Sequence, residues 1–210
     1  MKESLRKDIE DVIKATFDDM LKIYKLQTTG EGVPESKLRF PYKYKNHEQG
    51  KLRISEQELR SLFVEKLQNK GLYYNIEAPT MGDYRFENTE GKVRSGNFDL
   101  VICDETGKER YALIEFKGLN PDKKCYAKDY WKLQNSQEQG VLRYFLQVVK
   151  SANDNTYENI AKKKDSIKEF AQNKAFNVNI NDLKEQVIYR CISLDDSKEI
   201  TDEIHLPNHP

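Results

Sequence analysis

Two apolar segments that each carry a carboxylate constrain this chain more than any other feature. The first spans residues 95–103 and contains Asp99, and the second spans residues 110–117 and contains Glu115. Both segments are rich in β-branched and aromatic residues, and the link at 104–108 (DETGK) has the composition of a turn, so together they predict a β-hairpin. An acid in an apolar strand is costly to bury unless it is paired or binds a metal. The hairpin therefore predicts a site in which these carboxylates are paired or bind a metal.

Strand alternation brings a lysine to the same place. Lys117 follows Glu115 by two positions, so both side chains lie on one face of the strand. With a turn near Thr106, Asp99 is expected roughly opposite Leu113, one pleat from Glu115. Neighbouring carboxylates raise each other's pKa unless a cation lies between them, and Mg²⁺ or Mn²⁺ prefers such oxygen ligands. We predict a divalent-metal site with an attendant lysine, which suits metal-assisted hydrolysis of a phosphodiester.

The alternative is a surface hairpin whose outer face carries these charges incidentally. The apolar residues around Glu115 (Ala-Leu-Ile-Glu-Phe) disfavour that interpretation, because an ordinary solvated edge is less apolar.

Composition predicts a folded chain without a strong overall field. The 210 residues include 35 Lys and Arg against 35 Asp and Glu, which permits local basic patches only. Three widely spaced cysteines give no disulfide framework and fit a reducing compartment. The start lacks an apolar signal core, and no apolar run approaches the length of a membrane span. We therefore expect a cytoplasmic protein that does not associate with membranes.

Hydrophobic spacing predicts the remaining elements. Residues 5–26 have the apolar periodicity of a helix, and Ser55 with Glu58 forms the capping-box signature of a second helix that ends at Gly71. Further helices are predicted at 124–137 and 158–170, and strands at 72–76, 141–149 and 186–194. Residues 77–83 are interpreted as a turn-rich link, and the C-terminal tail as polar.

This order of elements predicts an α/β fold with a mixed central sheet flanked by helices. A crossover helix permits parallel pairing of the later strands. We expect residues 1–54 to form an N-terminal helical extension and an aromatic, basic arm packed on a core at 55–210. The apolar stripe of the first helix would also allow a homodimer.

Two basic segments are candidates for nucleic-acid contacts. The segment at 39–45 interleaves aromatic residues with cations that include Lys43 and Lys45, so cations can meet phosphates while rings stack on bases. Three lysines recur every four residues in the predicted helix after the hairpin: Lys124, Lys128 and Lys132. One exposed face could hold a phosphate backbone beside the metal site. A packing arm and an ordinary solvated lysine face are the alternatives, and neither patch indicates sequence specificity.

The pattern Gly96-Asn-Phe-Asp99, strand, turn, Glu115-Phe-Lys117 resembles the PD-(D/E)xK nuclease superfamily, which includes restriction endonucleases and Holliday-junction resolvases. The family core is a helix, a three-stranded meander, a helix and a further strand, similar to the order predicted for residues 55–149. The resemblance implies a restriction-endonuclease-like fold and a Mg²⁺- or Mn²⁺-dependent nuclease, with DNA favoured over RNA as the substrate. Phe98 stands where the family commonly has proline.

The same resemblance implies roles for individual residues. Asp99 and Glu115 would be metal ligands, the backbone carbonyl of Phe116 would complete the metal shell, and Lys117 would be the catalytic lysine.

Many members of the family add an acid from the first core helix. Glu58 is the first choice here and Glu65 the second, and the capping box alone explains Glu58 equally well. Two other functions stay open at this point. One is a non-catalytic nucleic-acid- or protein-binding module on the same fold, and the other is an interaction protein whose first helix pairs with another chain.

Overall fold

The computed structural model describes residues 2–44, 50–84, 94–119, 123–134, 140–152 and 186–204. Its helices are α1 (Lys2–Thr29), α2 (Glu56–Lys70) and α3 (Lys123–Gln134). The strands of the central sheet are β3 (Tyr73–Tyr84), β4 (Arg94–Cys103), β5 (Arg110–Gly118), β6 (Leu142–Val149), β7 (Val187–Ser193) and β8 (Lys198–Ile204). A separate two-stranded ladder consists of β1 (Tyr42–Lys43) and β2 (Lys51–Leu52). The helix predicted at 158–170 lies outside the described residues.

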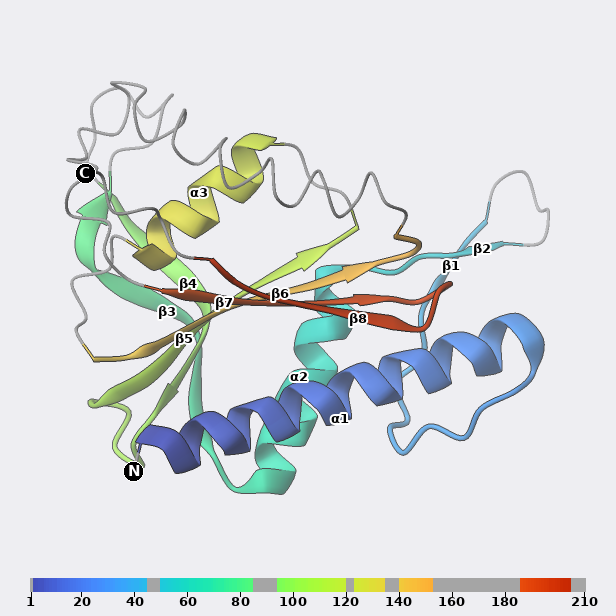
Figure 1. Ribbon diagram of the computed structural model, residues 1–210, viewed down its shortest axis with the longest axis horizontal. Helices are drawn as coiled ribbons and strands as arrows, with labels where there is room; N and C mark the ends of the chain where they lie inside the picture. The colour runs from blue at the N-terminus through green and yellow to red at the C-terminus, as the bar shows by residue number, and fades with distance from the viewer. Residues whose placement is uncertain are drawn as a thin grey trace.

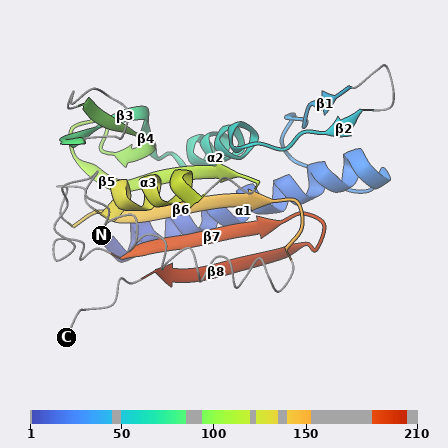
Figure 2. The same ribbon diagram turned by 90° about the horizontal axis from the view of Figure 1, so that it is seen from above.

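The central sheet is mixed, with the strand order β3-β4-β5-β6-β7-β8. The first three strands form an antiparallel meander, β5, β6 and β7 run parallel, and β8 returns antiparallel to β7. Helices α1 and α2 cover one face and α3 lies over the other (Figure 1; Figure 2 shows the sheet from above). The predicted α/β fold with a mixed sheet flanked by helices is thus confirmed. Every residue of β6 is buried, as expected for a central strand covered on both faces.

Two parts of the sheet differ from the sequence prediction, and both lie at its edges. Strand β3 continues through residues 77–83, which were predicted to be a turn-rich link, with a register shift between Pro79 and Asp83. An edge strand tolerates Pro79 because its N–H side needs no partner. Strand β8 lies where a polar tail was predicted. An edge strand buries little, so its polar composition gave no hydrophobic signal.

The second helix forms as its capping signals predict. The Ser55 side chain accepts a hydrogen bond from the Gln57 backbone N–H, and Glu58 completes the capping box. Gly71 ends the helix in the left-handed conformation, with φ 74°, where a residue without a Cβ is favoured.

The first helix is an integral part of the core. Its apolar stripe, including Ile9, Ile13 and Phe17, is buried in one cluster with α2 and with Ile114 of β5. The stripe that was predicted to allow a homodimer is therefore covered within the chain itself. None of the described helices is both long enough and apolar enough to cross a membrane.

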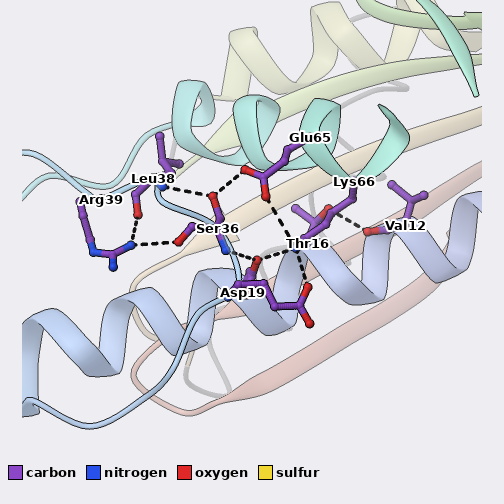
Figure 3. A network of polar contacts seen from close by, with 9 residues as sticks. Val12, Thr16, Asp19, Ser36, Leu38, Arg39, Glu65 and Lys66 are labelled. Atoms are coloured by element: carbon purple, nitrogen blue, oxygen red, sulfur yellow. Dashed lines mark hydrogen bonds and ion pairs between the residues drawn. The ribbon is translucent and has the colours of Figure 1, made fainter. Parts of the chain in front are cut away.

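A buried lysine ties the segment after α1 to both helices (Figure 3). The Nζ atom of Lys66 lies 2.6 Å from Oδ2 of Asp19 and 3.0 Å from Oε2 of Glu35. Asp19 also accepts hydrogen bonds from the backbone N–H groups of Glu35 and Ser36. Burial raises the pKa of Asp19, but these hydrogen bonds outweigh it and lower the pKa overall. The network holds the chain in place where it leaves α1.

Strand alternation in β5 sets up the candidate site. Ile114 and Phe116 pack into the α1–α2 core, whereas Leu113 packs into the second core with Tyr130 and Phe145, whose rings stack at 4.4 Å. The alternate residues Glu115 and Lys117 therefore lie on the α3 side of the sheet.

Candidate functional site

The pairing of β4 with β5 places Asp99 beside Glu115. Leu113 pairs with Val101, so the prediction that Asp99 lies opposite Leu113 is wrong by two residues. Oδ2 of Asp99 accepts a hydrogen bond of 2.7 Å from the backbone N–H of Phe116, at the peptide that joins Glu115 to Phe116. Burial raises the pKa of the Asp99 carboxyl, although this hydrogen bond and the nearby lysines act in the opposite direction.

Glu115 is an acid in the interior, with 1% of its surface exposed. Its Oε1 atom lies 2.5 Å from Nζ of Lys132, with which it forms an ion pair. Burial raises the pKa of Glu115 well above its usual range, and the nearby carboxylates of Asp99 and Asp129 act in the same direction. Lys132 opposes this rise without cancelling it. The site therefore contains a carboxylate whose charge is only partly compensated.

Lys117 lies between two acids from different helices. Its Nζ atom is 2.7 Å from Oδ2 of Asp129 in α3 and 3.8 Å from Oε2 of Glu56 in α2. Burial lowers the pKa of Lys117, but these acids, with a contribution from Asp99, outweigh it and raise the pKa overall. Lys117 is therefore a cation at neutral pH.

Lys132 occupies an interior position that the sequence did not predict. Its Nζ atom donates a 2.6 Å hydrogen bond to the backbone oxygen of Asn97 and lies 3.6 Å from Oδ1 of Asp129. Only 6% of the side chain is exposed. This placement corrects the expectation that Lys132 belongs to an exposed face, and the reason is that Tyr130 and Leu133 anchor α3 with this side toward the sheet.

The other predicted nucleic-acid contacts have different placements. Lys128 is exposed on α3, and Lys43 is exposed in β1. The backbone of Lys124 lies in α3, but its side chain is outside what the structure describes, and Lys45 lies outside the described residues altogether.

The structure does not bring Glu58 or Glu65 to Lys117. Oε2 of Glu58 accepts hydrogen bonds from the backbone N–H and the hydroxyl of Ser55, and Glu65 accepts one from the Ser36 hydroxyl. The contacts of Glu58 are thus those of a helix cap.

The acid of α2 that does reach Lys117 is Glu56, at the first position of the helix. The start of α2 packs tightly on the end of β5, where a Cβ on Gly118 would lie 2.6 Å from the Glu56 nitrogen. Sequence reasoning missed Glu56 because no local pattern shows this approach.

The donor set fits a divalent ion held by few protein ligands. Within the described residues, no three or more His, Cys, Asp or Glu side chains are arranged to hold a metal ion. Mg²⁺ usually binds through one or two carboxylates and keeps several waters, which matches the pair Asp99 and Glu115. Because the Lys132 ammonium contacts Oε1 of Glu115, a metal ion at that oxygen would compete with this ion pair.

Comparisons with known proteins add little to this geometry. No protein-family model matches the chain, and no curated protein matches it. Among solved structures, the chain is similar to SfsA from Pyrococcus furiosus in complex with Ca²⁺, at 12% identity over 72% of this chain and a TM-score of 0.31. The chain spans 65% of the length of that protein. A likeness this distant carries no argument about function.

Proposed function

We propose that the protein is a divalent-metal-dependent nuclease that hydrolyses phosphodiester bonds, with DNA as the favoured substrate. The observation that carries the proposal is the convergence of Asp99, Glu115 and Lys117 on one face at the end of β5. The Lys132 ammonium and the Phe116 N–H only partly offset the cost of desolvating Glu115 and Asp99, so a bound cation gives these carboxylates a purpose. The antiparallel meander followed by α3 and a parallel strand is also the order that the PD-(D/E)xK resemblance implies.

The residues take distinct roles in this proposal. Asp99 and Glu115 hold the ion, with Mg²⁺ or Mn²⁺ as the chemical fit and the Phe116 carbonyl as a further ligand. When bound, the ion supplies Lewis-acid polarisation of the phosphate and lowers the pKa of a bound water. Lys117, held as a cation by Asp129, stabilises the negative charge that develops on the phosphate oxygens. Its raised pKa favours this role over that of a general base.

The second candidate is a non-catalytic binding module on the same fold. It is favoured by one observation, which is that Lys117 pairs with Asp129 and Lys132 pairs with Glu115 within the chain itself. If each lysine serves only to compensate the charge of its acidic partner, the cluster is a structural ion network and the fold acts as a scaffold.

A cleavage assay tests the proposed function. Wild-type protein is incubated with supercoiled, linear and single-stranded DNA in Mg²⁺, Mn²⁺ or EDTA, beside Glu115→Ala and Lys117→Ala. Matched controls are Glu105→Ala and Lys108→Ala, which remove the same charges from the exposed turn of the same hairpin. We expect metal-dependent cutting that falls about 100-fold or more in both site variants and is unchanged in the controls.

The opposite results are equally informative. Cutting that persists in Glu115→Ala and Lys117→Ala would place the activity elsewhere or in a contaminant. Folded wild-type protein that neither cuts DNA nor binds Mn²⁺ by calorimetry would overturn the proposal in favour of the scaffold.

A further inference from the structure

A basic, aromatic arm extends from the body of the protein beside the candidate site. The arm consists of residues 39–44 and 50–53, and it extends past the end of the sheet next to the C-terminal end of α1 (Figures 1 and 2). Strands β1 and β2 pair within it, and the Arg53 N–H donates to the Pro41 carbonyl at 2.8 Å. The Gln27 side chain hydrogen-bonds both the N–H and the carbonyl of buried Phe40. The base of the arm is therefore anchored to α1.

The arm exposes aromatic rings that no core requires. Tyr44 is 69% exposed and Tyr42 is 40% exposed, and their ring centroids lie 6.3 Å apart at an interplanar angle of 37°. Rings held this way on a narrow hairpin offer faces on which planar groups can stack.

The arm is also the basic part of a neutral chain. The arm carries four cations and no acid: Arg39, Lys43, Lys51 and Arg53. Within the described residues, Lys43, Lys51 and Arg53 are exposed, and no ion pair is described for them there. Local positive charge in a chain of zero net charge favours a polyanionic partner at this surface.

A hollow connects the arm to the candidate site. It has a volume of about 380 Å³ and is lined by residues 53–57 and 118–119, between the start of α2 and the end of β5. Glu56 in its wall contacts Lys117. The hollow therefore lies between Arg53 of the arm and Glu56, the residue that contacts Lys117.

We propose that the arm binds a single-stranded segment of the nucleic acid next to the bond that is cut. Cations interleaved with exposed rings hold a backbone while the bases stack, and only unpaired bases present their faces to a ring. A duplex keeps those faces inside its own stack. The inference rests on the proposed function and adds the form of the substrate, which is an unpaired end, flap or single strand.

Binding in EDTA tests the surface separately from the chemistry. The probe is fluorescein-labelled oligothymidylate followed by anisotropy, with a duplex of equal length for comparison. We expect Tyr44→Ala to weaken single-strand binding about tenfold and Tyr44→Trp to restore it, because both aromatic side chains stack. Tyr73→Ala is the matched control, since Tyr73 is 53% exposed on β3 outside the arm and should bind as wild type.

The salt dependence tests the cationic part of the surface. Lys43→Ala and Lys51→Ala should each reduce the slope of log affinity against log salt by about 0.7, as expected when one phosphate contact to a single strand is lost. Single-strand binding that is indifferent to Tyr44, or a duplex that binds more tightly than the single strand, would overturn the inference.

The two proposals fail in different ways. Glu105→Ala, in the exposed turn of the hairpin and outside both the arm and the candidate site, should bind the oligonucleotide in EDTA as wild type does. Metal-dependent cutting with binding that ignores Tyr44 would overturn the arm alone. Tyr44-dependent binding by a protein that never cuts and binds no metal would support the surface and overturn the nuclease.

Discussion

The Nζ atom of Lys117 lies 2.7 Å from Oδ2 of Asp129, and this contact joins the acidic hairpin to the helix that crosses it. Burial alone would lower the pKa of Lys117, yet the carboxylates of Asp129, Glu56 and Asp99 together outweigh burial and the pKa is raised. Asp129 is therefore a positioning residue in the proposed enzyme, since it acts on the substrate only through the charge and direction of Lys117.

Asp129→Asn should move the alkaline limit of the activity. Without the carboxylate, the pKa of Lys117 falls, so the cationic form is lost at lower pH than in the wild type. We expect the alkaline limb of the kcat/KM profile to shift to lower pH, with a loss of roughly tenfold or more in rate above it. Glu105→Gln in the exposed turn is the matched control. A variant that instead gains activity at acidic pH would show that Lys117 acts as a base.

Lys132→Met should increase the affinity of the site for Mn²⁺. The ammonium lies 2.5 Å from Oε1 of Glu115, so it opposes a divalent ion at that carboxylate. Its removal leaves Glu115 uncompensated, and we expect the metal-free protein to lose about 3–5 kcal/mol of unfolding free energy. Calorimetry at alkaline pH should show Mn²⁺ affinity about tenfold or more above wild type.

The control for this variant is Lys128→Met, an exposed lysine on the same helix. Urea denaturation with and without Mn²⁺ gives a second measurement, because the ion should recover the lost stability in Lys132→Met. Equal or weaker Mn²⁺ binding than in wild type would contradict competition between Lys132 and the metal.

Asp99→Asn should stabilise the metal-free protein while abolishing its activity. Burial raises the pKa of Asp99 above its usual 3.8, so its ionised form costs stability above the raised pKa, and this cost disappears below 3.8. Asparagine can still accept the Phe116 N–H without carrying a charge. We expect about 1 kcal/mol of added stability near neutral pH, measured by urea denaturation across pH, and no gain below 3.8. A destabilised Asp99→Asn protein at neutral pH would contradict a desolvated carboxylate.

Glu58→Gln separates the capping role from the catalytic one. Glutamine can accept the Ser55 hydrogen bonds but cannot act as an ionised carboxylate. We expect Glu58→Gln to keep both stability and cleavage, and Glu58→Ala to lose about 1 kcal/mol of stability. A Glu58→Gln protein of normal stability that no longer cuts DNA would instead place Glu58 in the active site.

Local physics made part of this molecule predictable. Side chains alternate between the two faces of a strand, so Glu115 and Lys117 lie on one face of β5 in any fold that keeps this strand. The capping box at Ser55 and the left-handed turn at Gly71 depend only on neighbouring residues, and both formed as predicted. The register of the hairpin was wrong by two residues. One comes from the bulge between Ile102 and Cys103 and the other from a turn centred just past Thr106, and neither leaves a mark in the composition of the turn.

Whether each lysine of α3 is buried or exposed depended on how the helix packs against the sheet. Spacing placed Lys132 with Lys128 on one lysine face, but a helix face becomes interior or exposed only when it meets the sheet. Tyr130 and Leu133 bind α3 to the second core, and that contact turns Lys132 toward Glu115 while Lys128 faces outward.

The acidic strand pair, its lysine and the helix caps were thus determined by the sequence alone, because each depends on residues a few positions apart. The partners of those charges were decided only by the tertiary structure. Asp129 and Glu56 reach Lys117 from different helices, and Lys132 of α3 contacts Glu115 of β5. Ion pairs between distant segments depend on the positions of helices against a sheet, and no pattern within one segment encodes those positions.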